Sequence, residues 1–171
     1  MKGEIKVNNQ KTFFISDTHF NHANIIKYCN RPFKTVDEMN SKLISNWNSV
    51  VSDNDIVYFL GDFAFGDKEA FSRFAAPLKG HKHFIIGNHD RISKKIILDA
   101  GFESVNSQLI LKYEEYNFFL THYPREVEKG EICIYGHVHD KKEELSCRSF
   151  CVCVEQINYT PIEINELIRR I

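Results

Sequence analysis

The stretch DIVYFLGD, residues 55–62, joins a short apolar run to a glycine and a carboxylate. The uninterrupted apolar residues 56–60 are typical of a central strand that is buried on both faces. Gly61 and Asp62 follow directly, so the strand is expected to end in a tight turn that carries the Asp62 carboxylate. This pattern indicates a buried sheet, and the segments on either side of it indicate the class of fold.

Apolar runs alternate with helical patterns along the rest of the chain. Seven runs are predicted as strands: residues 11–16, 55–60, 81–86, 108–113, 117–122, 131–136 and 149–157. Apolar residues at helical spacing predict helices within residues 22–29, 35–51, 67–78, 92–101 and 161–171. The early alternation implies an α/β core, and the later strands imply a second sheet or an antiparallel extension. We expect two packed sheets flanked by helices.

The composition is that of one globular domain. The chain has 171 residues, of which 43% are hydrophobic, enough to bury a sizeable core. Its 22 basic and 23 acidic residues nearly balance, which argues against a general nucleic-acid coat or a binder of anionic membranes. No apolar run is long enough to cross a membrane, and the polar N-terminus does not resemble a signal peptide. We predict a single cytoplasmic domain over residues 1–171.

The five cysteines do not suggest a disulfide framework in a chain of this length. We therefore expect reduced thiols. Cys151 and Cys153 are interpreted as buried thiols of one strand, with Cys147 nearby, and their roles stay open.

Polar side chains follow five of the predicted strands, in the fragments DTH (17–19), GD (61–62), GNHD (87–90), TH (121–122) and GHVH (136–139). Strand ends that face one way converge on a crevice in α/β folds, so these groups are expected to meet. Singly, each fragment has an ordinary explanation: an aspartate after a strand is usually a helix cap, and a loop histidine is usually solvated. The five together predict a metal site.

The chemistry of these side chains limits which metal ions the predicted site could bind. Carboxylate, amide and imidazole groups without a thiolate suit Mn²⁺, Fe, Zn²⁺, Co²⁺ or Ni²⁺. The set is too large for one tetrahedral ion and fits two ions that share a carboxylate. The candidate ligands are Asp17, His19, Asp62, Asn88, His122, His137 and His139.

The order D-x-H, G-D, G-N-H-D, H and G-H-x-H resembles that of the calcineurin-like metallophosphoesterases. The resemblance covers roughly residues 12–158, and every position of the pattern is present. The stretches SDTHFNHANIIKYCNRPF (16–33) and GDFAFG (61–66) resemble small bacterial or phage-type members of this superfamily. The resemblance implies a four-layer α/β/β/α sandwich with two packed mixed sheets.

The resemblance also implies roles for the ligands. One ion would be held by Asp17, His19 and His139, the second by Asn88, His122 and His137, and Asp62 would bridge them. The cofactor would be two divalent metal ions, with Mn²⁺ favoured.

Two further residues would act in catalysis. His89 would face the scissile phosphate and protonate the leaving group, and Asp90 would orient His89 by accepting its ring proton. The nucleophile would be a hydroxide that bridges the two ions.

Substrate contacts are expected from Arg31, His22 and Asn88. The guanidinium of Arg31 suits phosphate, although a salt bridge or a loop-stabilising contact is an equal alternative. For His22 the alternatives are a helix N-cap and a solvated position. The aromatic residues Phe20, Phe63 and Phe65 flank the ligand motifs and could stack on a nucleobase, but such residues more often pack in the core.

The sequence thus predicts a dinuclear metal-dependent phosphoester hydrolase. A phosphodiesterase that acts on a nucleotide or a similar small phosphoester is favoured, because the short chain shows no cap domain over the site. The alternatives are a phosphomonoesterase and a non-catalytic metal-binding scaffold of the same fold, and the presence of His89 favours an enzyme. The substrate, the native metal, nucleic-acid binding and the oligomeric state are left open.

Overall fold

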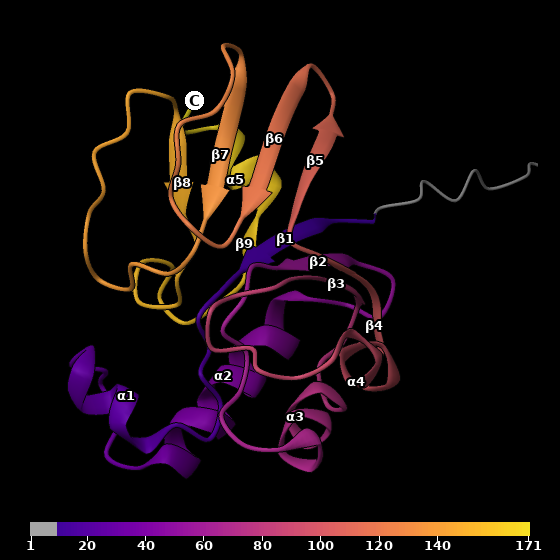
Figure 1. Ribbon diagram of the computed structural model, residues 1–171, viewed down its shortest axis with the longest axis vertical. Helices are drawn as coiled ribbons and strands as arrows, with labels where there is room; N and C mark the ends of the chain where they lie inside the picture. The colour runs from indigo at the N-terminus through magenta and orange to yellow at the C-terminus, as the bar shows by residue number, and fades with distance from the viewer. Residues whose placement is uncertain (1–9) are drawn as a thin grey trace, which may run out of the picture.

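The computed structural model describes residues 10–171 and contains two packed β-sheets (Figure 1). The first sheet has the strand order β4-β3-β2-β1-β9 and the second has the order β5-β6-β7-β8. The strands of the first sheet are β1 (Thr12–Ile15), β2 (Ile56–Phe59), β3 (His81–Ile85), β4 (Phe102–Asn106) and β9 (Ile162–Glu163). Those of the second are β5 (Gln108–Tyr113), β6 (Tyr116–Thr121), β7 (Glu131–Tyr135) and β8 (Ser149–Cys151).

Strands β1 to β4 are parallel, so their carboxyl ends share one edge of the first sheet. Ile15 pairs with Phe59 and Phe59 pairs with Phe84, which sets the register of the three central strands. Strand β9 runs antiparallel to β1. In the second sheet β6, β7 and β8 are parallel and β5 is antiparallel. Both sheets are therefore mixed, and the predicted α/β fold with two packed mixed sheets is confirmed.

Successive side chains of a strand face opposite sides of its sheet, and this divides the core into layers. In β2, Val57 and Phe59 face an aromatic-rich cluster beneath the helices, while Tyr58 and the next residue after the strand, Leu60, face the second sheet. Because both faces of such a strand are buried, its sequence is apolar throughout. Strand β7 is likewise buried on both faces: Ile134 faces the first sheet and Cys133 faces outward.

Helices cover the outer face of the first sheet (Figure 1). They are α1 (Ala23–Tyr28), α2 (Val36–Val50), α3 (Lys68–Ala75) and α4 (Lys94–Asp99). Thr35 accepts a hydrogen bond from the Glu38 N–H and so caps α2, and Asp67 caps α3 in the same way. Among residues 10–171, none of the helices is both long and apolar enough to span a membrane.

Three segments of the structure differ from the prediction. The predicted strand 149–157 ends at Cys151, and the chain then turns toward the first sheet. Pro161 does not open a helix: Ile162 and Glu163 form β9 first, and α5 (Ile164–Ile168) follows. Strand β4 was not predicted, because its sequence FESVN lacks a continuous apolar run and only its first residue is fully buried.

Candidate metal centre

Backbone hydrogen bonds join the loops at the carboxyl edge of the first sheet. The Asp17 N–H donates to the Gly61 carbonyl at 2.9 Å, and the His19 N–H donates to the Asp62 carbonyl at 3.0 Å. Two further bonds link this loop to the second sheet, because Ser16 exchanges them with the chain just after β8. The loops that carry the predicted ligands are therefore one connected framework.

Two glycines allow these loops to approach one another. A Cβ atom at Gly87 would lie 2.3 Å from Asp62 Oδ1, and one at Gly136 would lie 2.5 Å from Asp17 Oδ2. Distances of this size are not tolerated between non-bonded heavy atoms, so any larger residue would displace a carboxylate. The glycines expected to admit close approach thus lie directly against the candidate ligands.

Several candidate ligands adopt a left-handed backbone conformation. This region is unfavourable for residues other than glycine, although Asp, Asn and His tolerate it better than most. Several residues with this backbone conformation in one site are typical of functional loops. The φ angles are 58° for Asp17, 47° for His19, 60° for Asp62, 73° for His137 and 56° for His139.

Asp17, His19 and His139 form the first candidate group. Asp17 Oδ1 lies 3.8 Å from Nε2 of His19 and 3.8 Å from Nε2 of His139. Ligand atoms that share an ion at about 2.1 Å lie about 3–4 Å apart, so this spacing fits a common ion. Asp17 Oδ1 and His19 Nε2 are buried and have no hydrogen-bond partner within residues 10–171. Such unpartnered polar atoms are costly unless something binds them.

Asp62, His122 and His137 form the second group, and Asn88 lies beside it. The Asn88 Oδ1 atom is 2.9 Å from His122 Nε2 and 3.0 Å from His137 Nδ1. The other ring nitrogen of His122 lies 2.7 Å from the Leu60 carbonyl, which can only accept. The Leu60 carbonyl therefore orients the His122 ring, with Nε2 directed toward Asp62 and Asn88.

Asp62 lies between the two groups. Its Oδ2 atom is 3.5 Å from His19 Nε2 and 3.5 Å from His122 Nε2, while Oδ1 accepts the His89 N–H at 2.9 Å. A single oxygen midway between imidazoles of both groups is the geometry required of a carboxylate that ions on either side would share.

Burial shapes the protonation of this region. Burial, with the charge of His139 as a second cause, lowers the pKa of His19 to about 2, so its ring stays neutral and can act as a ligand. Burial also raises the pKa of Asp62 to about 6, against the opposing effect of His122. Cys153 Sγ lies 3.2 Å from Asp17 Oδ2, and burial raises the pKa of this thiol. It therefore stays protonated and donates, which leaves the donor set free of thiolate.

Glu155 is a site residue that sequence analysis missed. Its Oε1 atom lies 2.9 Å from His139 Nδ1 and so orients this ring with Nε2 toward Asp17. The same oxygen accepts bonds from Arg31 at 2.9 and 2.7 Å. Glu155 lies in a segment that was expected to be strand, and no local pattern marks it.

Arg31 is not placed to meet a substrate. Its guanidinium is fully buried and donates to Glu155 and to the backbone carbonyls of Asp17 and Thr18. The loop-stabilising alternative for Arg31 is the one that the contacts fit, since the fork is saturated by groups of the protein itself.

Asp90 also differs from its expected place. Its carboxylate accepts the backbone N–H groups of Asp62, Phe63 and Gly87 at 2.7–3.0 Å. Within residues 10–171 no hydrogen bond joins it to the His89 ring. Asp90 therefore fixes the backbone of the turn that carries Asp62, which is a positioning role different from the predicted one.

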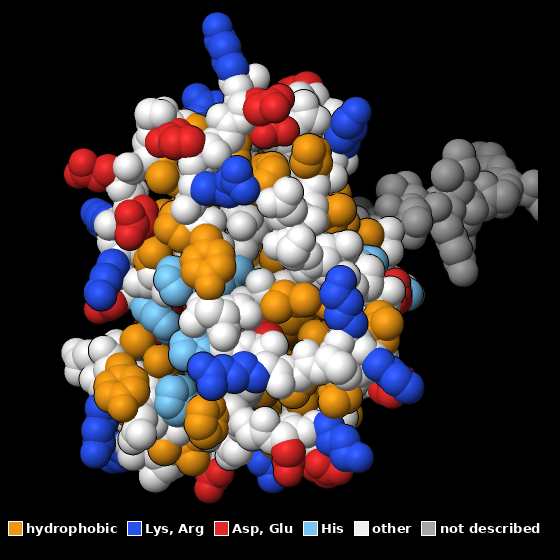
Figure 2. Space-filling model, in the orientation of Figure 1, with side chains coloured by type: hydrophobic (Ala, Val, Ile, Leu, Met, Phe, Trp, Pro, Cys, Tyr) orange, Lys and Arg blue, Asp and Glu red, His pale blue; other side chains and the backbone are white. Residues whose placement is uncertain are grey.

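The remaining predicted residues line the open side of the centre. His89 and Asn88 are exposed, and the His89 ring lies 5.5 Å from that of His19. His22 is half-buried at the start of α1 with its ring 5.7 Å from His19, so it lies at the rim. In Figure 2 the histidine side chains form one band across the face shown. Of the three expected substrate contacts, Asn88 and His22 thus lie at the centre and Arg31 behind it.

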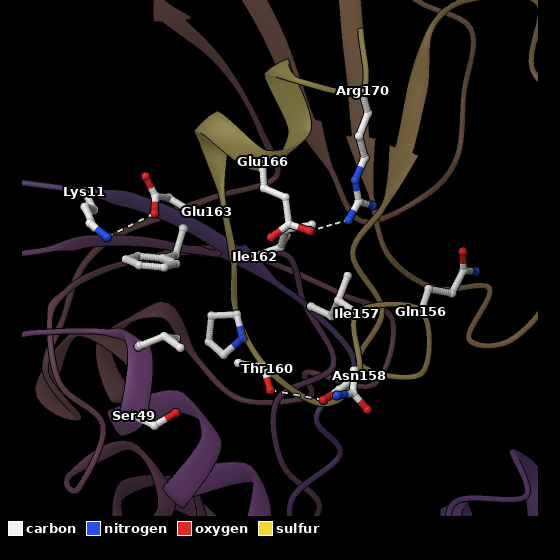
Figure 3. A pocket seen from close by; sticks show the side chains of 13 residues that line it. Lys11, Ser49, Gln156, Ile157, Asn158, Thr160, Ile162, Glu163, Glu166 and Arg170 are labelled. Carbon is white, nitrogen blue, oxygen red and sulfur yellow. Dashed lines mark hydrogen bonds and ion pairs between the residues drawn. The ribbon is translucent and has the colours of Figure 1, made fainter.

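A hollow in the described structure lies apart from the candidate metal centre. It has a volume of about 690 Å³ and is bounded by β1, β9 and α5 (Figure 3). Its charged side chains are already paired, Lys11 with Glu163 and Glu166 with Arg170. It holds none of the candidate ligands, so volume alone does not mark the functional site here.

Comparison with known protein families shows to which family the chain belongs. The family model described as calcineurin-like phosphoesterase matches residues 11–165, which is nearly the whole chain. The chain belongs to the calcineurin-like phosphoesterase family. It is accordingly a metal-dependent phosphoesterase, and the two candidate groups give it residues able to hold metal ions.

Individual relatives extend this result. An uncharacterized protein of Methanocaldococcus jannaschii is 40% identical over 173 residues, covering 95% of this chain and 92% of its own. The Gene 66 protein of Mycobacterium phage L5 is 27% identical, covering 75% of this chain and 77% of its own. The predicted likeness to phage-type members is thereby confirmed.

Two solved structures share the fold of this phosphoesterase. A protein of unknown function from Aquifex aeolicus superposes with a TM-score of 0.78 at 29% identity, covering 95% of this chain and 100% of its own. YfcE, a phosphoesterase from E. coli, has a TM-score of 0.50 at 16% identity, covering 84% of this chain and 78% of its own. At that identity the likeness to YfcE concerns the fold alone.

Proposed function

We propose that this phosphoesterase is a single-domain, dinuclear phosphodiesterase whose two ions share Asp62. The observation that carries the proposal is the place of Asp62 Oδ2, which is 3.5 Å from an imidazole nitrogen of each candidate group. Two bound divalent ions would neutralise phosphate charge and lower the pKa of a shared water, so that hydroxide forms near neutral pH. The donor set of carboxylate, amide and imidazole supports Mn²⁺ as the favoured ion.

The chain's own residues divide the remaining work. His89 is exposed beside the centre and would protonate the leaving alkoxide, a contribution of roughly 10²–10⁴-fold for a positioned acid. Asn88 would contact both an ion and the substrate phosphate. Asp90 and Glu155 would hold Asp62 and His139 in place and would not touch the substrate.

The buried, paired position of Arg31 supports a diester substrate over a monoester substrate. A monoester dianion carries one more negative charge than a diester, and arginine is the side chain best suited to neutralise it. Arg31 is buried against Glu155 and is not free to do so. The exposed His89 and Asn88 also leave the centre open to a substrate with two arms.

One screen tests the proposal. The metal-free protein is titrated with Mn²⁺ and assayed on bis-p-nitrophenyl phosphate and on p-nitrophenyl phosphate at equal concentration. A higher kcat/KM on the diester, with two ions per chain by metal analysis, supports a dinuclear phosphodiesterase. A higher value on the monoester would favour the phosphomonoesterase alternative. Bound metal without activity across Mn²⁺, Zn²⁺, Co²⁺ and Ni²⁺ would favour the scaffold.

A further inference from the structure

Exposed aromatic side chains gather around the candidate metal centre. Three aromatic residues are exposed within residues 10–171. They are Tyr28, Phe65 and Tyr123, with exposed fractions of 72%, 57% and 48%. Each of the three rings lies against a histidine of the centre or its rim. Exposed aromatic rings that gather at one place, while the other described aromatic residues are buried or partly buried, indicate a surface for binding.

Phe65 lies on the side of the group that contains His19. Its ring is parallel to that of His22, with 4.8 Å between centroids and 15° between planes, and His22 is 5.7 Å from His19. The backbone of Phe65 is held from both sides, by the Phe20 carbonyl at 2.8 Å and by the Asn21 amide at 3.1 Å. The backbone that carries the ring is thus held in place, and the ring itself is more than half exposed.

Tyr123 lies on the side of the other group. Its ring is 4.7 Å from that of His137 and 5.1 Å from that of His122. Because Tyr123 follows His122 directly at the end of β6, the strand that places the ligand also places the ring. Figure 2 shows hydrophobic side chains on both sides of the histidine band. The candidate metal pair therefore has an exposed aromatic ring on each flank.

The geometry points to a phosphodiester that joins two nucleosides as the substrate class. Its phosphate would bind at the metal centre, one base would stack on Phe65 and the other on Tyr123. Stacking on an aromatic face accepts any base, so no base preference is expected. This inference rests on the proposed phosphodiesterase activity.

The overall charge of the chain bears on the length of such a substrate, and the reaction fixes its products. A net charge of −1 argues against a general binder of nucleic acid, which suits a dinucleotide or the end of a single strand more than an extended polymer. Hydrolysis would break one P–O ester bond. The oxygen and one hydrogen of water would go to phosphorus, and the other hydrogen to the hydroxyl of the released nucleoside.

Binding tests the inference without turnover. The Mn²⁺-loaded full chain is titrated calorimetrically with a thymidine dinucleotide whose scissile ester oxygen is replaced by methylene. Phe65→Ala and Tyr123→Ala should each raise Kd about tenfold, since base–aromatic stacking contributes about that much. Phe65→Trp should keep the affinity of the unchanged chain. Ile110→Ala is the matched control, because it removes an equally exposed apolar side chain (51%) from β5 and should leave Kd unchanged.

The outcomes separate this inference from the proposed function. Equal Kd values for all variants would overturn the inference, even if the chain hydrolyses diesters. Ring-dependent binding without hydrolysis of any diester would support recognition of the two bases by the rings but would contradict the phosphodiesterase activity. In kinetic assays both alanine variants should lose about tenfold in kcat/KM on the dinucleotide but none on methyl p-nitrophenyl phosphate.

A second titration distinguishes the two sources of such a diester. A hydrolysis-resistant single strand of about 12 nucleotides that binds more tightly than the dinucleotide analogue would identify a strand end. Equal affinity would identify a dinucleotide. In either case the loss of affinity in Phe65→Ala must persist, and its absence would overturn the inference.

Discussion

Strand β2 has an aspartate at each end, and the two have opposite surroundings. Asp55, before the strand, has both oxygens occupied: Oδ1 accepts the Lys11 N–H at 2.8 Å, and Oδ2 accepts the Ser52 N–H and hydroxyl at 2.7 Å. Asp62, after the strand, has one oxygen bonded and the other facing imidazoles at 3.5 Å. Satisfied polar groups stabilise a fold, whereas buried unsatisfied ones are retained for a ligand. The amino edge of the first sheet is thus built for stability, and the carboxyl edge for binding.

The largest effect is expected at Asp62. Asp62→Ala removes the oxygen that both groups face, so the protein should bind fewer than two ions per chain and lose about 10³-fold or more in kcat, because metal ions supply several kcal/mol of transition-state stabilisation. Metal analysis after gel filtration and kcat on bis-p-nitrophenyl phosphate measure this. Two ions retained by the variant would contradict the bridging role.

His89→Ala should lower kcat about 10²–10³-fold on an unactivated diester, because the leaving alkoxide loses its acid. The loss should be smaller on a p-nitrophenyl ester, whose leaving group needs no proton, and metal content should not change. His81→Ala is the matched control from the other end of β3, where His81 pairs with Glu103. Equal activity of both variants on the unactivated diester would exclude His89 from the chemistry.

Glu155→Gln should weaken metal binding about 10–100-fold, because an amide orients His139 less firmly than a carboxylate. Competition with a fluorescent chelator measures the dissociation constant. Glu103→Gln, which alters the exposed partner of His81 at the opposite edge, should leave it unchanged. If the two variants bound metal equally well, Glu155 would have no positioning role.

The two ends of β2 should respond to the same substitution with opposite sign. In metal-free protein Asp62→Asn should raise the free energy of unfolding by about 1–2 kcal/mol, since it removes a buried charge. Asp55→Asn should lower it by about 1–2 kcal/mol, since charged hydrogen bonds are lost. Urea denaturation in the presence of a chelator compares them, and equal signs would refute the contrast between the edges.

The smallest effect concerns the pH dependence contributed by Asp55. Burial tends to raise its pKa, but hydrogen bonds from Lys11 and Ser52 outweigh it and lower the pKa. A lowered folded-state pKa gives stability that is present above the unfolded value, about 3.9, and is lost as the pH falls through the folded value. The difference in unfolding free energy between the unchanged chain and Asp55→Asn should therefore shrink from pH 7 to pH 3. A constant difference would contradict the assignment.

Much of the fold could be predicted because the central strands are buried on both faces. Strands β1, β2, β3, β5, β6 and β7 coincide with predicted apolar runs. The edge strands of the first sheet escaped detection: β4 has only one fully buried residue, and β9 has two residues after a proline. Short strands at a sheet edge form through pairing with a neighbour, which a local sequence pattern does not record.

The candidate ligands could be predicted because each follows a strand whose carboxyl end faces the same edge. Their supporting residues could not. Glu155 meets Arg31 across 124 positions of the chain, and Asp90 turned out to bind backbone N–H groups of another loop. Such partners are set by tertiary packing. The sequence therefore drew attention to Asp90 but did not identify the N–H groups that its carboxylate binds.

The left-handed backbone at Asp17, His19, Asp62, His137 and His139 bears on how this protein can evolve. Glycine adopts that conformation without cost, so replacing one of these residues by glycine would relax the loop while abolishing a ligand. Drift toward stability and selection for catalysis therefore act in opposite directions at the same codons. A lineage that no longer needed the reaction would be expected to lose these residues early and keep its fold.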